Sequence, residues 1–228
     1  ILKVYGKKNC SINEFEKFLT PKSKIGLISP ESFWKLFRTI WGNKTNKILN
    51  SIMYHKSSIT NKKLDIPYPN YQYPISSKPK LNLLFYPNGF LELQNVFPKN
   101  KSIEAFKELI SASQEFNLHP FICGVKRHKK DPSFLAFAND GLSITMNFSL
   151  NKIKNKHKEK YCDKLIEIIL DFKGKTYISK HAYLPKWAFQ KMYPDYTKIL
   201  QLKNKIDPRN IFTSDATKRL LLEWIRTK

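Results

Sequence analysis

Residues 143 to 149 alternate between polar and apolar side chains. Ser143, Thr145 and Asn147 fall on one side of an extended chain, while Ile144 and Met146 fall on the other. This pattern predicts a strand with one buried face and one face of hydroxyl and amide groups. A solvent-facing strand of a lysine-rich protein should carry lysine, so what this neutral polar face contacts is the first question.

Two further segments carry charged and polar groups in the same alternating pattern. Glu92 and Gln94 share one side of a predicted strand, and Lys126 and His128 share one side of another. If helices cover the apolar side of the sheet, all these groups converge on the opposite face, where Gly124 leaves room for close approach. This face is either solvated or the floor of a pocket for a polar ligand, with Lys126 available to an anion.

The residues alone show no complete catalytic set. The sequence has no Ser-His-Asp arrangement and no glycine loop of the kind that binds phosphate. The three cysteines and five histidines are dispersed, so we predict neither a disulfide framework nor a bound metal. By themselves, these groups support a binding surface.

The chain is strongly basic, since 41 Lys and Arg residues oppose 18 Asp and Glu residues, for a net charge of +23. Only five of the basic residues are arginine, whereas proteins that read nucleic acid favour the planar fork of arginine. We therefore predict no nucleic-acid partner, while anionic lipid or a phosphorylated substrate is compatible with the charge. The sequence has no run of 18 apolar residues, which argues against a transmembrane helix.

Hydrophobic periodicity predicts an α+β fold, in which helices cover one face of an antiparallel sheet. Helices are expected at 29–56 with a break at Gly42, at 101–116, at 155–172 with Gly174 as the C-cap, at 185–206 and at 215–227. Strands are expected at 81–86, 89–98, 119–128, 133–138, 142–150 and 175–179, with a hairpin signal at Asn139-Asp140-Gly141. A long connection rich in proline and tyrosine occupies 61–80.

The C-terminal third contains three short motifs in a fixed order. They are Tyr-x-x-Lys at 177–180, Met-Tyr-Pro at 192–194 and Asp-Pro-x-x-x-Phe at 207–212. Together they resemble the C-terminal end of FAD-linked oxidases of the vanillyl-alcohol-oxidase type. The resemblance implies that a C-terminal strand-and-helix segment completes a flavin-binding domain.

The resemblance continues through the middle of the chain, with departures. The Gly-Phe-Leu-x-x-Gln segment at 89–94 fits the family, and the strand at 141–148 has the family's length and direction. In that strand, Thr145 replaces a thiol, so it would not offer the same covalent reactivity, and Asn147 replaces a carboxylate. His128 stands where an aromatic residue is usual.

The resemblance implies a flavoprotein with FAD as its cofactor. Residues 1–174 would form a substrate (cap) domain and residues 175–228 the C-terminal segment of the FAD-binding domain, so the chain would be a fragment whose N-terminal FAD-binding half is absent. The implied reaction is oxidation of a sugar hydroxyl by hydride transfer to flavin, with a polyprenyl-phosphate pentose as the leading substrate. Another sugar-alcohol or aldonolactone oxidase of the same fold and a non-enzymatic basic binding module are the alternatives.

Roles for single residues follow from the same resemblance. Lys180 is the expected catalytic residue, which would stabilise negative charge on the flavin or orient the sugar hydroxyl. The expected cofactor-binding residues are Tyr177, Lys180 and Asn147. The expected substrate-binding residues are Gln94, Lys126, His128, Ser143, Thr145 and Tyr73. Besides the sugar substrate, the implied partners are a short-chain reductase and an anionic membrane, which suggests a cytoplasmic or membrane-associated protein of cell-wall biosynthesis.

Overall fold

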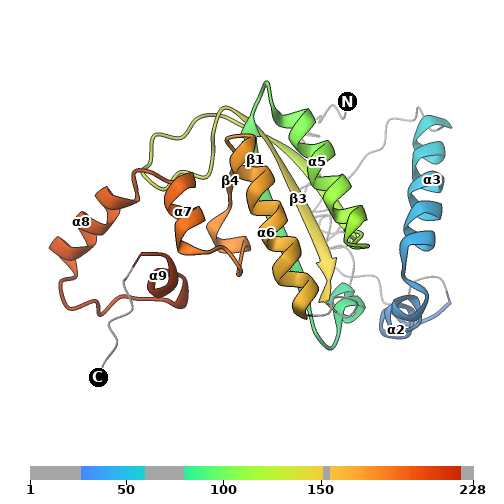
Figure 1. Ribbon diagram of the computed structural model, residues 1–228. Coiled ribbons are helices and arrows are strands. Elements are labelled where there is room, and N and C mark those ends of the chain that lie inside the picture. Colours follow the sequence, from blue (N-terminus) through green and yellow to red (C-terminus); the bar gives the residue numbers. More distant parts are fainter. Residues whose placement is uncertain (1–26, 60–79, 151–154, 222–228) are drawn as a thin grey trace, which may run out of the picture. The chain divides into compact units, whose positions relative to one another are not determined.

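The computed structural model describes residues 27–59, 80–150 and 155–221 (Figure 1). The chain forms two compact units that divide between Pro87 and Asn88. The boundary predicted between residues 174 and 175 would separate the substrate domain from the C-terminal segment of the FAD-binding domain. It stays a prediction. Within the described residues, no helix has the length and hydrophobicity that crossing a membrane requires.

Two α-helices and one 3-10 helix make up the described part of the first unit. Helix α2 (Pro30–Ile40) begins after Ser29, whose hydroxyl accepts a backbone N–H of the first turn. Helix α3 (Asn43–Ile59) follows the predicted break at Gly42. The 3-10 helix η1 (Leu81–Phe85) packs against α2.

The strand predicted at 81–86 is therefore wrong. Leu81, Leu84 and Phe85 are buried, and their spacing of three and four residues suits a helical turn. Periodicity alone cannot separate a short apolar strand from a buried helical turn, which explains the error.

In the second unit, the described residues form one antiparallel sheet in the order β2-β3-β1-β4. Its strands are β1 (Phe90–Pro98), β2 (Ile122–His128), β3 (Gly141–Ser149) and β4 (Lys175–Thr176). The three long strands confirm the predictions made from alternation. The strand predicted at 175–179 is right only at its first two residues.

Helices α5 (Ser102–Glu115) and α6 (Asn155–Asp171) cover the apolar face of this sheet, as predicted. The core side chains they enclose include Leu93, Phe97 and Met146 from the strands and Leu109, Leu165 and Ile169 from the helices. Full burial of each such side chain stabilises the fold by about 1.5–3 kcal/mol. Ile103 and Ile110 are exposed, because the buried stripe of α5 runs through Ala105, Phe106, Leu109 and Ala112.

Residues 129–140 connect β2 to β3 without regular structure, so the predicted strand at 133–138 is wrong. The hairpin predicted at Asn139-Asp140-Gly141 is wrong as well, because β3 pairs directly with β2. Asp131 accepts hydrogen bonds from the backbone N–H and the hydroxyl of Ser133. This Asx turn, with a proline at its centre, directs the chain away from the sheet.

Helix α6 ends at Asp171, and the prediction of Gly174 as its left-handed C-cap is wrong by one residue. Lys173 takes the left-handed conformation, with φ 56°, and its N–H donates to Leu170 O. The N–H of Gly174 donates to Ile169 O. Glycine at 174 is required for close packing, since a Cβ there would lie 2.6 Å from ring atoms of Phe97.

Gly174→Ala is expected to lower the free energy of unfolding by about 1–3 kcal/mol, because the added methyl group overpacks the core at Phe97. Gly124→Ala is a matched control, since a Cβ at Gly124 meets nothing within 4 Å. Urea unfolding followed by circular dichroism measures both variants. Equal stability of the two variants would contradict this explanation of Gly174.

Beyond β4 the chain forms η3 (Ile178–Lys180), α7 (Lys186–Met192), α8 (Tyr196–Ile206) and α9 (Asp215–Leu220). The single helix predicted at 185–206 is divided into α7 and α8, because Pro194 has no N–H to continue the hydrogen-bonding pattern. The last helix begins as predicted, with Ser214 accepting the N–H of Thr217. Its predicted end at 227 lies outside the described residues.

The turn after α8 is organised by the carboxylate of Asp207. It accepts the backbone N–H groups of Ile211 at 2.8 Å and Phe212 at 3.1 Å, and the ammonium of Lys203 at 2.6 Å. The Asp-Pro-x-x-x-Phe motif is therefore a structural turn in which Asp207 satisfies two backbone N–H groups beyond the helix. Helix α8 stops at Ile206, as predicted.

Candidate active site

The register of the sheet brings the predicted polar groups to one face. Residues opposite each other in an antiparallel pair share a face. The register pairs Glu92 with Asn147, Gln94 with Thr145, Lys126 with Ser143 and His128 with Gly141. The predicted convergence is confirmed, and the polar face consists of Glu92, Gln94, Lys126, His128, Ser143, Thr145 and Asn147. Tyr73 lies outside the described residues.

Lys180 reaches the polar face from the turn that follows β4. The N–H of Tyr177 donates to Gln94 O at 2.8 Å, which fixes the start of this turn to β1. The N–H of Lys180 donates to Tyr177 O at 2.9 Å and tightens the turn. The Lys180 ammonium consequently lies 3.2 Å from a carboxylate oxygen of Glu92.

Glu92 is a partner of Lys180 to which the sequence assigned no role. The side chain of Glu92 is 23% exposed and that of Lys180 is 39% exposed. An ion pair in contact with solvent contributes at most about 1 kcal/mol to stability. The main effect of the pair is therefore to orient the Lys180 ammonium over the polar face.

A chain of hydrogen-bonding groups crosses three strands on the polar face. His128 Nε2 lies 2.8 Å from Ser143 Oγ, and Gln94 Nε2 lies 3.4 Å from the same buried oxygen. Burial lowers the pKa of His128, and the charges of Lys126 and Arg127 lower it further. The imidazole is therefore neutral at neutral pH.

Two buried oxygen atoms of the polar face have no hydrogen-bond partner within the described part of the chain. They are Thr145 Oγ1 and Asn147 Oδ1. Leaving a buried polar atom unpaired costs about 1–3 kcal/mol. Two such atoms on one strand indicate a place where a bound group could complete the hydrogen bonding.

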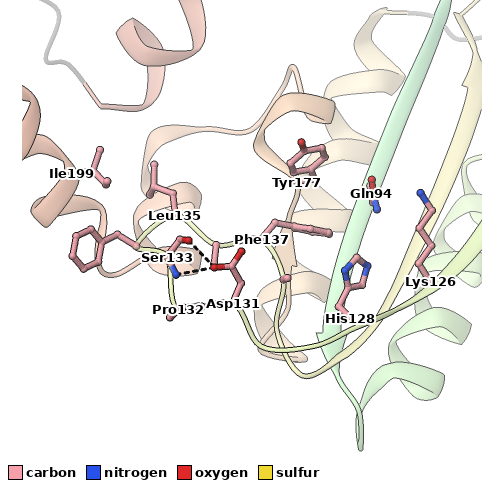
Figure 2. Close-up of a pocket in the computed structure, with 13 residues that line it drawn as sticks. Gln94, Lys126, His128, Asp131, Pro132, Ser133, Leu135, Phe137, Tyr177 and Ile199 are labelled. Atoms are coloured by element: carbon pink, nitrogen blue, oxygen red, sulfur yellow. Dashed lines mark hydrogen bonds between the residues drawn. The ribbon is translucent and has the colours of Figure 1, made fainter.

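A cavity of about 770 Å³ opens beside the polar face (Figure 2). Its polar end is formed by Gln94, Lys126 and His128, which Figure 2 shows together on the sheet. The other end is mostly apolar and is lined by Pro132, Phe134, Leu135, Ala136 and Ile199. The cavity therefore offers a polar and an apolar region to one ligand.

Phe137 joins these two ends of the cavity. Its ring centroid lies 5.5 Å from that of His128, edge to face, and 5.1 Å from that of Tyr177. Lys175 donates to Ala136 O at 3.3 Å and fastens the same segment to β4. The sequence prediction missed Phe137 because it placed 133–138 in a strand, although the Asp-Pro pair before it signalled a turn.

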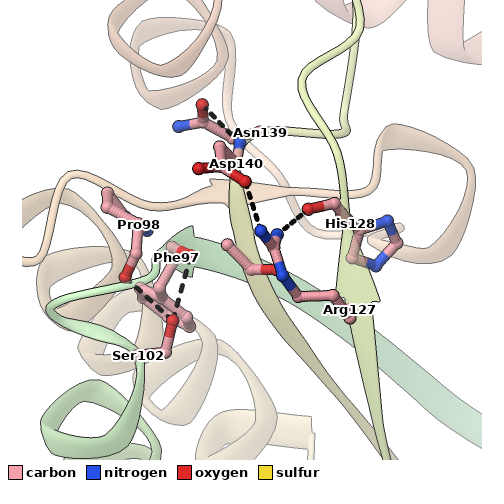
Figure 3. Close-up of polar contacts among 8 residues, drawn as sticks. Phe97, Pro98, Ser102, Arg127, His128, Asn139 and Asp140 are labelled. Carbon is pink, nitrogen blue, oxygen red and sulfur yellow. Dashed lines mark hydrogen bonds and ion pairs between the residues drawn. The ribbon is translucent and has the colours of Figure 1, made fainter.

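Arg127 holds the two ends of the 129–140 connection together (Figure 3). Its guanidinium is paired with Asp140 and donates to the carbonyl oxygens of His128 and Gly141. The guanidinium also holds the pKa of the Asp140 carboxyl below its usual range. Figure 3 also shows the hydroxyl of Ser102, which donates to Pro98 O at 2.8 Å. This hydrogen bond joins the start of α5 to the end of β1.

Comparison with known proteins confirms the resemblance to FAD-linked oxidases. The decaprenylphosphoryl-beta-D-ribose oxidase of Mycolicibacterium smegmatis is 24% identical over 175 residues, which are 76% of this chain and 37% of that protein. The L-gulono-1,4-lactone dehydrogenase of Mycobacterium tuberculosis is 24% identical over 135 residues, 58% of this chain and 31% of that protein. The chain thus spans about a third of the length of these relatives.

The sheet and the Lys180 turn both fall within the segment that a family model recognises. The model for D-arabinono-1,4-lactone oxidase matches residues 90–220. This segment includes all of the polar face and the whole helical layer that covers the sheet. Since it makes up more than half of the sequence, the chain belongs to the D-arabinono-1,4-lactone oxidase family.

Proposed function

We propose that this chain supplies the substrate-binding sheet and the catalytic lysine of a FAD-dependent oxidoreductase that oxidises a hydroxyl group of a sugar or sugar lactone. The observation that carries the proposal is the Lys180 ammonium, held 3.2 Å from Glu92 over a face where two buried oxygens have no partner among the described residues. Family membership supports it, because the family consists of FAD-dependent oxidases. In this proposal residues 175–228 belong to the FAD-binding domain.

The polar face fits a flavin ring. A flavin edge carries both N–H and C=O groups, which suits Asn147 Oδ1 and Thr145 Oγ1, two atoms without a hydrogen-bond partner in the described part of the chain. When bound, FAD would accept the electron pair of the substrate C–H bond. Lys180 would stabilise the negative charge that this transfer brings to the site, and Tyr177 would line the same region.

The polar end of the cavity would bind the sugar. The side-chain amide of Gln94 and the ammonium of Lys126 can donate to sugar hydroxyl or phosphate oxygens. No ion pair engages Lys126 within the described residues, so its charge is available to an anionic group. Fixing the sugar at several points holds the reacting carbon in one orientation, which is the main contribution a protein makes to such a reaction.

A polyprenyl-phosphate pentose is the specific substrate that we propose. Such a molecule has a polar sugar, an anionic phosphate and an apolar tail, which suit the polar end, Lys126 and the apolar end of the cavity in turn. A lipid-linked substrate would bring the protein to an anionic membrane, which the net charge of +23 favours. A short-chain reductase would then take up the ketone that the oxidation forms.

The experiment is anaerobic mixing of the FAD-loaded protein with three classes of substrate, while the yellow absorbance of the flavin is followed. A polyprenyl-phosphate pentose is expected to bleach the flavin faster than a free aldonolactone or a sugar alcohol. Faster bleaching by the lactone would support the proposed oxidoreductase activity, but with a lactone in place of the polyprenyl-phosphate pentose as the substrate. No bleaching by any of the three, combined with salt-sensitive binding to DNA or RNA, would favour the basic binding module.

A further inference from the structure

We infer that His128 accepts the proton of the substrate hydroxyl, and that Ser143 and Gln94 hold it in position. The inference rests on the proposed function, since an alcohol oxidation requires this proton to leave. The C–H bond breaks and its electron pair passes to the flavin oxidant, while the O–H bond breaks and its electron pair forms the C=O bond. The hydroxyl proton goes to the imidazole of His128, which later releases it to solvent.

The other titratable groups that line the cavity are poor proton acceptors. The proposed function already assigns Lys126 to the anionic group of the substrate and Tyr177 to the flavin region. Asp131 accepts two hydrogen bonds from Ser133, and these hold the pKa of its carboxyl below the usual value. A carboxylate stabilised in this way is a weaker base than a neutral imidazole.

The geometry around His128 leaves one basic nitrogen available. In the tautomer that carries its proton on Nε2, the ring donates to Ser143 Oγ at 2.8 Å. The same oxygen has a second lone pair for the Gln94 amide at 3.4 Å. Within the described part of the chain, no hydrogen bond engages Nδ1. Its lone pair is therefore available, and Nδ1 is the atom that takes the proton. A base oriented by a third group is a recurring arrangement in enzymes.

Phe137 completes the placement of the ring. Its edge-to-face contact with the imidazole, at an interplanar angle of 82°, restricts rotation of the side chain. Ser143 is fully buried below the ring, so a substrate in the cavity meets His128 before it meets the serine. Ser143 is therefore a positioning residue, and His128 is the group that touches the substrate.

The charges near His128 favour its neutral form before substrate binds. Lys126 and Arg127 precede it on β2, and the positive charges of both lower the pKa of its imidazole. Among the described residues, the other charged or titratable groups of the elements packed around it are Lys129, Lys130, Asp131 and Asp140 of the connecting loop, Lys175 of β4, Tyr177 just before η3, and the Lys180–Glu92 pair. Because Arg127 is paired with Asp140 and Lys180 with Glu92, Lys126 is the cation that most directly opposes protonation of the ring.

The test compares His128→Gln and Ser143→Ala with the native protein, all loaded with FAD. We expect His128→Gln to slow flavin reduction about 100-fold with little change in KM, and to remove the fall of the rate at acid pH. Ser143→Ala is expected to slow flavin reduction by about tenfold. It should retain the fall of the rate at acid pH, because His128 is still present. His157→Gln, on the exposed side of α6, is the control and should match the native protein.

A measurement independent of turnover is the NMR titration of the His128 imidazole, identified by its absence from the His128→Gln spectrum. It should titrate below the ordinary histidine value of about 6.5. A rate for His128→Gln within about threefold of native, with the same acid dependence, would overturn the inference and leave the proposed function intact. A native protein whose flavin no sugar substrate reduces would overturn the proposed function, and the role of His128 with it.

Discussion

Lys180→Met is expected to slow substrate-dependent flavin reduction by about 100- to 1000-fold, the usual cost of losing one preorganised group at a developing charge. Methionine keeps the length of the side chain and removes its charge. The turn that carries residue 180 is fixed by the Tyr177–Gln94 backbone hydrogen bond, so it is retained, and Glu92, whose side chain is in contact with solvent, loses its ammonium partner. Rapid mixing with the substrate under anaerobic conditions measures the effect.

Two matched variants separate the role of Lys180 from its surroundings. Lys164→Met removes an exposed lysine of α6 whose partner is Glu167 at 3.6 Å, and it should reduce flavin at the native rate. Lys180→Arg keeps the charge but spreads it over a planar group, so partial activity is expected. Native turnover by Lys180→Met, with FAD bound and the circular dichroism spectrum unchanged, would remove Lys180 from the mechanism.

The polar face was the part of the site that the sequence predicted best. A period of two residues decides which side of a strand each residue occupies, so Ser143, Gln94 and Lys126 could be assigned to one face before any pairing was known. The register then had to bring these sides together, since one face of the sheet must meet the helices. The helical layer was equally predictable, because Leu109 and Leu165 recur at helical spacing.

The walls of the cavity could not be predicted in the same way. Phe134 and Phe137 belong to a short continuous apolar run, as residues of a buried strand do, yet the Asx turn at Asp131 and the contacts of this segment with Tyr177 and Lys175 place it in a loop. These contacts join segments that are far apart in sequence, and no local pattern records them. Tertiary contacts therefore override strand propensity where the cavity is formed.

The Lys180–Glu92 pair shows the same limit. Glu92 was placed on the polar face by alternation, but its partner comes from a turn 88 residues further along the chain. Resemblance to known oxidases suggested Lys180, and the two-residue length of β4 explains how it reaches the sheet. A strand continued to residue 179 in the register of β4 would end opposite Glu92 and place Lys180 opposite Leu91, on the apolar side of the sheet, whereas the 3-10 turn after Tyr177 brings the ammonium to Glu92.

The second large effect concerns pH and the residue that follows Lys180. The native protein is expected to lose about 3 kcal/mol of stability between pH 6.5 and pH 4 through His181 alone. His181 is 1% exposed, and neither ring nitrogen has a hydrogen-bond partner among the described residues. Burial lowers its pKa to about 4, with a further contribution from the Arg219 guanidinium, which donates to the carbonyl oxygens of His181 and Leu184.

The direction of this effect follows from which state binds the proton. Above pH 6.5 the imidazole is neutral in both the folded and the unfolded chain, so it adds no pH dependence. Between pH 6.5 and about 4 the unfolded chain takes up a proton that the folded protein excludes, and unfolding becomes more favourable. Below about pH 4 both states are protonated and the loss is complete.

His181→Leu should abolish this part of the pH dependence, because leucine fills a similar volume without a titrating group. At neutral pH the variant should be at least as stable as the native protein, since the ring nitrogens it removes make no hydrogen bond to any described residue. Urea unfolding at about pH 7 and about pH 4.5 measures both, and the difference between the proteins cancels the titration of the carboxylates they share. His157→Leu, at an exposed position, is the control. The same acid loss in His181→Leu as in the native protein would show that the buried imidazole is not its source.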